Sequence, residues 1–230
     1  MSSKHYFVYL TQEDIPGLYP PTELLVKPKK TNKSYARIAH FSPDTPSLNV
    51  YIDNMILGGD IDYTERTLYR LLEQGSHTIT VYPAGEKEPI LDDTFIMPQG
   101  TIITIALIIK LEELSLEIIN DSTRILPNEI VAKFVNYSPN SPNLDALIND
   151  TEYFSEIIYD QVTSYVTLPD ATNYNLKLRN SDTGEIILEL PNIVLSPNKA
   201  YTFYVIGLYE DTPPLQVVTT LDGSSYLLDE

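Results

Sequence analysis

The chain of 230 residues contains no cysteine and no tryptophan. Without cysteine, disulfide bonds and thiolate metal sites are excluded. Histidine is also scarce, since only His5, His40 and His77 occur. Imidazole is the side chain that most often serves as a general base or a metal ligand near neutral pH. The sequence therefore offers little material for acid–base or metal chemistry.

Long hydrophobic runs are also missing. The most apolar window, residues 101–119, is interrupted by Lys110, Glu112 and Glu113, so we expect no membrane insertion. The apolar run at residues 6–10 is too short for a signal peptide, and no Ala-x-Ala-like cleavage site follows it. We therefore expect a soluble protein that does not use a Sec signal peptide.

Basic side chains are few compared with acidic ones. Lysine and arginine together number 15, against 32 aspartates and glutamates, which gives a net charge of −17. Such a chain repels nucleic acid and anionic membrane surfaces at long range. Nucleic acid is therefore not an expected partner.

Tyrosine and proline are abundant, with 17 of each. Short apolar or alternating runs follow one another through residues 35–110 and again through residues 130–221, separated by Pro, Gly, Asp and Asn. A spacing of roughly 8–15 residues between such runs is typical of antiparallel β-sandwiches. The segment "KLEELSLEII" has a helical option, but we interpret it as a strand that leaves the first series. The sequence predicts an all-β protein.

The phrase "HFSPDTPSLNVYI" at residues 40–52 returns as "NYSPNSPNLDALI" at residues 136–148. Residues 36–52 and 132–148 share six identities over seventeen positions without a gap. The later features keep the same order in both halves, which indicates a tandem duplication. We predict an N-terminal arm and linker at 1–34, a first sandwich at 35–122 and a second at 123–230.

Three motifs, "RIAHFSPDTPSLNVYIDN", "GSHTITVYPAGEKEPIL" and "MPQGTIITIAL", resemble the bacterial domain-of-unknown-function family 4397. The second half resembles it too, above all in "SPNKAYTFYVIGLYEDTPPLQVV", so that the resemblance covers about residues 35–228. It implies two tandem immunoglobulin-like antiparallel β-sandwiches on a surface or exported bacterial protein. It implies no activity. Two features depart from the family: no signal peptide is evident, and Asn136 stands where a His is usual.

The repeated phrase raises the question of a duplicated active site. A base or metal ligand would tolerate the change from His40 to Asn136 poorly, whereas a structural hydrogen-bonding residue would tolerate it well. Ser42 lacks the Gly-x-Ser-x-Gly context of a nucleophile. We predict no catalytic residues, no metal and no cofactor. We interpret the phrase as a structural corner between two strands, made by His40, Ser42, Pro43 and Pro46 in the first copy and by Asn136, Ser138, Pro139 and Pro142 in the second.

Two further possibilities stay open. Asp53, Asn54, Asp60 and Asp62 offer oxygen ligands for Ca²⁺, but their spacing is not that of an EF-hand, and solvated turns explain them better. An internal isopeptide bond would suit a cysteine-free, durable protein. It requires a buried Lys, an Asn and an acid in contact, which a sequence alone does not reveal.

The N-terminal segment "KHYFVYL" reads as a lone strand that could lodge on the sheet edge of another copy. A head-to-tail contact of this kind does not close and would propagate a filament. Folding back onto its own sandwich is the alternative for this segment. The residues of this assembly arm are Lys4, His5, Tyr6, Phe7, Val8, Tyr9 and Leu10.

These observations favour a structural, self-assembling subunit of a bacterial surface structure, such as a spore coat layer, a spore appendage or another fibre. Its expected partners are other copies of itself, and it is not expected to be an enzyme. Its expected location is the bacterial spore or cell surface, with the cytoplasm as the alternative. The other function class is a monomeric surface module that binds carbohydrate or another ligand through exposed tyrosines.

Overall fold

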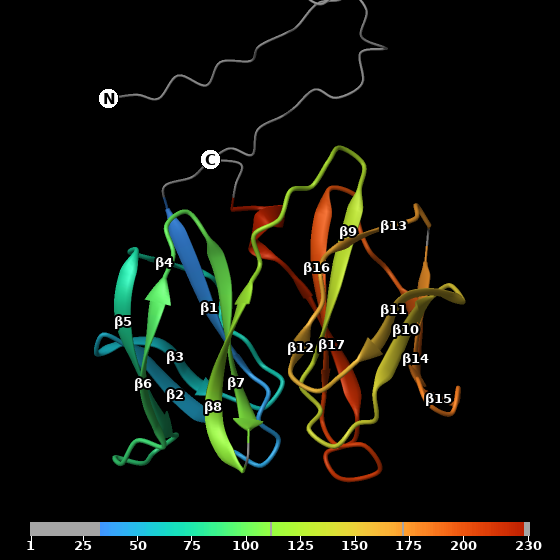
Figure 1. Ribbon diagram of the computed structural model, residues 1–230. Coiled ribbons are helices and arrows are strands. Elements are labelled where there is room, and N and C mark those ends of the chain that lie inside the picture. Colours follow the sequence, from blue (N-terminus) through green and yellow to red (C-terminus); the bar gives the residue numbers. More distant parts are fainter. Residues whose placement is uncertain (1–32, 111, 172, 228–230) are drawn as a thin grey trace, which may run out of the picture. The chain divides into compact units, whose positions relative to one another are not determined.

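The computed structural model describes residues 33–110, 112–171 and 173–227. These residues form seventeen strands and one short 3-10 turn, η1 (Gly223–Ser225). Figure 1 shows how these elements are arranged. No helix among them is long and apolar enough to cross a membrane. The predicted all-β architecture is confirmed. Most of the predicted N-terminal arm, residues 1–32, lies outside the described residues, and so does the whole assembly arm Lys4–Leu10.

The first copy folds into two four-stranded sheets, drawn from blue to green in Figure 1. The inner sheet has the order β4-β1-β7-β8 and the outer sheet the order β3-β2-β5-β6. The strands are β1 (Ser34–His40), β2 (Leu48–Ile52), β3 (Met55–Ile61), β4 (Arg70–Leu72), β5 (Gly75–Pro83), β6 (Leu91–Met97), β7 (Ile102–Lys110) and β8 (Glu113–Asn120).

The second copy repeats this plan. Its inner sheet has the order β12-β9-β16-β17, with β13 also paired to β9, and its outer sheet has the order β11-β10-β14-β15. The strands are β9 (Ile130–Asn136), β10 (Leu144–Ile148), β11 (Thr151–Ile157), β12 (Gln161–Val162), β13 (Val166–Leu168), β14 (Tyr174–Asn180), β15 (Ile186–Ile193), β16 (Lys199–Ile206) and β17 (Gln216–Leu221).

One pairing in each inner sheet differs from the antiparallel expectation. β1 pairs with β7 in parallel, and β9 pairs with β16 in parallel, while the other named strand pairs are antiparallel. Parallel neighbours need a long connection, and here the intervening strands of the sandwich supply it. The segment "KLEELSLEII" is a strand as predicted, because β8 forms a hairpin with β7.

The inner strands are buried on both faces. All seven residues of β9 are buried, as are seven of the nine in β7. In β1, Ala36 and Ile38 belong to the core of the first sandwich, whereas Ala39 belongs to a different apolar cluster. Strands buried on two sides read as continuous apolar runs, whereas β5 of the outer sheet alternates between buried and exposed positions.

The cluster on the far side of the inner sheets joins the two sandwiches, and we call it the seam. Phe41 lies against Tyr204 there, with ring centroids 4.7 Å apart. The inner sheets of the two copies therefore share a third apolar core in addition to the core of each sandwich. The seam consists of Ala39, Phe41, Ala106, Ile108 and Ile119 from the first sandwich and Val135, Tyr137, Tyr204 and Ile206 from the second.

The last strand of the first copy ends at Asn120, and the first strand of the second copy begins at Ile130. The two copies are not independent at their ends, because Ser224 Oγ donates to the carbonyl of Asp121, 3.0 Å away. The bounds 35–122 and 123–230 for two separate domains stay a prediction.

Candidate functional site

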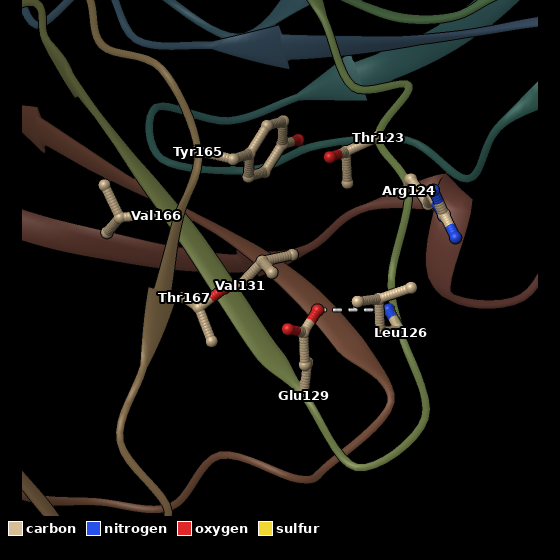
Figure 2. Close-up of a pocket in the computed structure, with 8 residues that line it drawn as sticks. All are labelled: Thr123, Arg124, Leu126, Glu129, Val131, Tyr165, Val166 and Thr167. Carbon is tan, nitrogen blue, oxygen red and sulfur yellow. Dashed lines mark hydrogen bonds between the residues drawn. The ribbon is translucent and has the colours of Figure 1, made fainter. Parts of the chain in front are cut away.

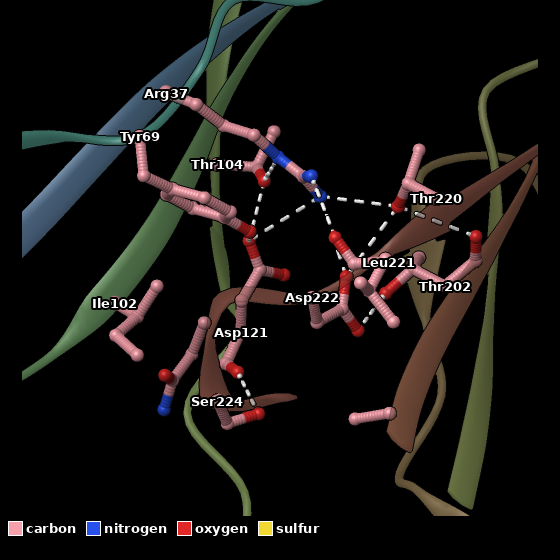
Figure 3. A network of polar contacts seen from close by, with 12 residues as sticks. Arg37, Tyr69, Ile102, Thr104, Asp121, Thr202, Thr220, Leu221, Asp222 and Ser224 are labelled. Carbon is pink, nitrogen blue, oxygen red and sulfur yellow. Dashed lines mark hydrogen bonds and ion pairs between the residues drawn. The ribbon is translucent and has the colours of Figure 1, made fainter. Parts of the chain in front are cut away.

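At one end of the seam the apolar contacts give way to a buried polar cluster, and Figure 3 shows the part of it around Arg37, Asp121 and Asp222. Four charged side chains meet there. Arg37 comes from β1 and Lys133 from β9, each on the seam face of a strand whose other face lines a sandwich core. Asp121 and Asp222 directly follow β8 and β17. Each of the four residues is at most 2% exposed.

The ion pairs cross from one copy to the other. Lys133 Nζ lies 3.1 Å from Asp121 Oδ1, and Arg37 Nη2 lies 3.3 Å from Asp222 Oδ1. Arg37 Nη2 also lies 3.7 Å from Asp121 Oδ2. Each copy thus supplies the cation for the carboxylate of the other. Breaking one such buried pair leaves an uncompensated charge, which is strongly destabilising.

The neighbours of the charges obey the same twofold relation. The Tyr69 hydroxyl donates to Asp121 Oδ2 at 2.6 Å, and the Tyr165 hydroxyl donates to Asp222 Oδ2 at 2.7 Å. The ring of each tyrosine also faces the cation of its own copy. Arg37 Cζ lies 4.4 Å from the Tyr69 ring centroid, and Lys133 Nζ lies 4.6 Å from that of Tyr165.

Threonines complete the cluster in both copies. Thr104 on β7 donates to Asp121, and Thr202 on β16 donates to Asp222 Oδ2 at 2.7 Å. The Arg37 guanidinium donates to Thr104 Oγ1 at 2.7 Å, to the Leu221 carbonyl at 3.0 Å and to Thr220 Oγ1 at 3.0 Å. The charged groups are therefore satisfied by protein partners, as buried charges must be.

The sequence patterns do not predict this cluster, although one signal of it is present. Arg37 and Lys133 occupy the same column of the repeat alignment, in two strands that are otherwise largely apolar. The carboxylates are harder to find, because "NDS" and "LDG" look like ordinary turns after a strand. No local pattern indicates that the partner of each cation belongs to the other copy.

The predicted corner residues lie between the strands that were expected to flank them. Ser42 N–H donates to His40 Nδ1 at 3.3 Å, so that His40 Nε2 carries the proton and donates to the Pro46 carbonyl at 3.2 Å. Burial lowers the pKa of His40, which favours this neutral form. Ser42 Oγ and Thr45 Oγ1 are also hydrogen-bonded.

The second corner repeats the first with an amide. Ser138 N–H donates to Asn136 Oδ1 at 3.1 Å, in the place of the bond from Ser42 to His40. Asn136 Nδ2 donates to Ser141 Oγ at 3.0 Å and to the Ile157 carbonyl at 3.4 Å. Pro43, Pro46, Pro139 and Pro142 lie in these two connections. That all these residues serve structure alone stays a prediction.

The calcium alternative finds no support in the geometry. Asp53 is bound to His77, with Oδ2 2.6 Å from Nδ1, and Asp62 accepts a hydrogen bond from Ser47. In the described part of the chain, no group of three or more His, Asp or Glu side chains could hold a metal ion.

The described surface has a shallow depression of about 310 Å³ beside the link between the copies, drawn in Figure 2. Arg124 and Leu126 of the link border it, and Val131, Tyr165 and Thr167 lie opposite. Leu126 N–H donates to Glu129 Oε2 at 3.1 Å. Glu129 is the one carboxylate that lines the depression, and this hydrogen bond engages it. The depression brings together no acid–base pair.

The first prediction concerns Asp222. Burial raises the pKa of this carboxyl to about 7, and the charge of Asp121 adds to the rise, although Lys133 and Arg37 oppose it. Because the folded pKa lies above 3.8, the ordinary value for an aspartate, the contribution of Asp222 to stability is complete below pH 3.8 and is lost as the pH rises towards 7. Asp222→Asn, which mimics the protonated acid, should remove this loss, on the order of a few kcal/mol.

The measurement is the urea unfolding free energy at several pH values between 4 and 7.5. Asp182→Asn, a change of the same charge at an exposed position, is the matched control. Parallel pH profiles for the wild type and Asp222→Asn would show that the pKa of Asp222 is not raised.

The second prediction concerns the corner. His40→Asn should cost less than about 1 kcal/mol, because an amide can accept the Ser42 N–H as Asn136 accepts that of Ser138. His40→Ala should cost about 2–3 kcal/mol, since it leaves two backbone groups without a partner and opens a cavity. Chemical denaturation of both variants provides the comparison. Equal losses would mean that the hydrogen bonds of the corner do not account for the role of His40.

Comparison with known proteins confirms the family resemblance that the sequence motifs indicate. No curated protein matches the chain. Two stretches, residues 34–139 and 131–225, match the family described as Domain of unknown function (DUF4397).

Three solved structures are similar to the chain at low identity. The family 26 module CBMbc of Eubacterium rectale Amy13K, solved with maltoheptaose, is 13% identical with a TM-score of 0.27, covering 83% of this chain and 99% of that one. Family 41 carbohydrate-binding modules from streptococcal virulence factors reach 10% identity and a TM-score of 0.28, covering 85% and 100%. The fimbrial anchor protein Mfa2 of Porphyromonas gingivalis is 12% identical with a TM-score of 0.24, and the match covers 83% of this chain and 98% of that one.

TM-scores this low carry no argument about what the present chain binds. The two family matches, by contrast, extend over most of the chain and include both repeats with their corners. The chain belongs to the DUF4397 family, and it carries two copies of the family's domain in tandem.

Proposed function

We propose that the chain is a structural, self-assembling subunit of a bacterial surface structure, such as a spore coat layer, a spore appendage or another fibre. In this proposal the subunit acts without catalysis, and its partners are other copies of itself. The assembly arm Lys4–Leu10 of one copy adds as a strand to a sheet edge of the next. The observation that supports it most is the open edge of β17.

β17 pairs with β16 on one side and with no described strand on the other. Its register with β16 is regular from Gln216 to Leu221, and its sequence "QVVTTL" contains no charge, proline or glycine. The Leu221 carbonyl accepts from Arg37, so the unpaired edge ends at Thr220. A regular, uncharged edge strand is a template for pairing with another chain. Backbone hydrogen bonds would supply affinity for an added strand, and alternate side chains would set its register.

The other long edge strands that the structure describes carry features that oppose such pairing. β3, β11 and β15 have shifts of register, and β15 also contains Pro191. β6 carries Asp92 and Asp93, and β8 carries Glu113 and Glu117. Charges, bulges and proline protect edges from unwanted pairing. This contrast favours β17 as the acceptor.

The chemistry of the arm is complementary to the rest of the chain. Residues 1–32 contain four of the 15 basic side chains but only three of the 32 acidic ones, so the remaining 29 acidic groups belong to residues 33–230. An arm with a small positive charge is attracted to a strongly acidic body. The residues between Leu10 and β1 would reach roughly 75 Å if extended, which is enough to reach a neighbouring copy.

The third prediction tests this edge. The Asp222 N–H donates to the Ala200 carbonyl at 2.9 Å, and bonded pairs alternate along an antiparallel ladder, so the N–H of Thr219 points away from β16. Thr219→Pro should therefore abolish assembly while leaving the ladder with β16 intact. Deletion of residues 1–15 should abolish it as well. Light scattering and electron microscopy measure particle size, and thermal unfolding shows that each variant is folded.

Thr219→Val, which keeps the N–H, is the matched control and should assemble like the wild type. A wild-type protein that stays monomeric at high concentration would contradict self-assembly. Assembly that survives both the deletion and Thr219→Pro would leave a self-assembling subunit but eliminate strand donation at β17.

The second candidate function, a module that binds carbohydrate or another surface ligand, is favoured by one observation. Tyr51 and Tyr82 stand on the solvent face of the outer sheet of the first sandwich, with ring centroids 5.7 Å apart and planes at 86°. Both are half-buried, and the exposed Thr78 and Thr94 lie on the same face. Aromatic rings beside hydroxyl groups on a flat sheet can receive a sugar ring. The outer sheet of the second sandwich instead carries the ion pair between Arg179 and Asp145 at 2.6 Å.

The fourth prediction distinguishes this candidate. If the tyrosine pair binds glycans, Tyr51→Ala and Tyr82→Ala should each lower binding on a glycan array at least tenfold, whereas Tyr209→Ala on the second sandwich should not. An array without signal for the wild-type protein would eliminate the tyrosine pair as a glycan site and would leave the assembly proposal unaffected.

A further inference from the structure

Lys133 and Asp121 bring an amine against a carboxylate in the buried interior between the two copies. Nζ of Lys133 lies 3.1 Å from Oδ1 of Asp121, and Oδ1 is bonded directly to the carboxyl carbon Cγ. Their side chains are 2% and 0% exposed. Lys133 Nζ is held from a second direction, because it donates to the Asn120 carbonyl at 2.5 Å. The amine is thus directed at the carboxyl group in a site from which solvent is almost excluded.

The other oxygen of Asp121 is bound separately. Oδ2 accepts a hydrogen bond from the Tyr69 hydroxyl at 2.6 Å and another from Thr104, and Arg37 Nη2 lies 3.7 Å away. Two hydroxyl donors and a guanidinium on one carboxyl oxygen stabilise negative charge there. Such prearranged donors lower the barrier to nucleophilic attack on the adjoining carbon. Oδ1, the oxygen nearest the amine, is left as the one that can depart.

We propose that Lys133 and Asp121 are joined covalently, through an isopeptide bond between Nζ of the lysine and Cγ of the aspartate. The step needs no cofactor, oxidant or reductant. A proton passes from the ammonium group to Oδ1, and the neutral amine attacks Cγ, so that negative charge gathers on Oδ2. A second proton passes from nitrogen to Oδ1, the Cγ–Oδ1 bond breaks, and Oδ1 leaves as water. Nitrogen loses two hydrogens and gains the bond to carbon, with no change in oxidation state.

The surroundings support this condensation. Fixing the two groups in contact replaces an encounter between molecules by a step within one molecule, which is worth many powers of ten in effective concentration. The Tyr165 ring covers the amine, and Gly223 and Ser224 of η1 are buried beside the link, so that water has little access to reverse the reaction. Asp222, whose carboxyl accepts from Tyr165, is a second buried acid that can hold a proton near neutral pH.

The twofold relation of the seam provides an internal comparison. Arg37 is the counterpart of Lys133, but a guanidinium stays protonated and is no nucleophile under ordinary conditions. The contact of Arg37 with Asp222 therefore cannot condense in this way. Formation of the bond removes one positive and one negative charge together, which leaves the remaining pair balanced. This inference does not depend on the proposed function, since a cross-link within one chain requires no second copy.

The experiment is mass spectrometry of the full-length wild-type protein after denaturation. The intact mass should be lower than the sequence mass by that of one water molecule. Trypsin does not cleave after an acylated lysine, so the digest should contain residues 111–124 joined to residues 125–177 as one branched peptide. Free peptides 111–124 and 125–133 should be absent.

Lys133→Arg is the matched variant, because the seam already accepts arginine at the equivalent position 37. It should keep the ion pair and show the full sequence mass. Two results would overturn the proposal: a mass lower by one water in Lys133→Arg, or a mass lower by one water in peptide 111–124 without a branch. Dehydration of Asp121 alone gives either result. A wild-type protein with the full sequence mass would overturn it directly, whatever the behaviour of the variant.

Discussion

The rest of the architecture depends on the burial of four charges between the two inner sheets. Arg37, Lys133, Asp121 and Asp222 have lost nearly all contact with water, and each is compensated by a partner from the other repeat. Charge buried in this way is tolerated only when its geometry and its hydrogen bonds are complete. The two sandwiches are thereby tied to one arrangement. Apolar contacts such as that of Phe41 with Tyr204 could slide, whereas crossed ion pairs define a single register.

The seam also explains the character of the inner strands. β1, β7, β9 and β16 must satisfy a sandwich core on one face and the seam on the other, so their residues are buried almost without interruption. The outer strands face water on one side, and their exposed faces have diverged. Tyr51 and Tyr82 mark one of these faces, while Arg179 and Asp145 mark the other. The two copies therefore resemble each other in the residues that lie between them and differ in the residues on their outer faces.

Much of the fold follows from the sequence. The repeated Ser-Pro-x-x-Pro phrase, the apolar runs and the turn residues predict two β-sandwiches, and "KLEELSLEII" is the strand that was expected. β3 and β11 leave a weaker signal in the sequence. β3 contains Gly58 and Gly59 and shifts register against β2, and β11 shifts register against β10, so neither shows clean alternation. The parallel pairing of β1 with β7 depends on contacts between distant segments, which local patterns do not encode.

The buried cluster was harder to predict from the sequence than the fold. A lysine in an apolar strand is visible at position 133, but its carboxylate follows a strand of the other repeat and resembles a turn residue. The corner was easier, because His40 and Asn136 act through backbone groups a few residues away. Short-range hydrogen bonds leave a signature in the sequence around them. Long-range pairs appear only after the sheets are placed against each other.

The crossing of the pairs has a consequence for the order in which the chain can mature. The carboxylate that compensates Arg37 lies 185 residues later in the chain, close to the end of the second repeat. A ribosome releases the first repeat long before Asp222 is made, and during that interval Arg37 has no counter-ion from the second sandwich. The face of β1 around it must stay hydrated until β17 and the turn after it are complete. The seam therefore closes late, because the seam face of β1 can be buried only after β17 has been synthesised.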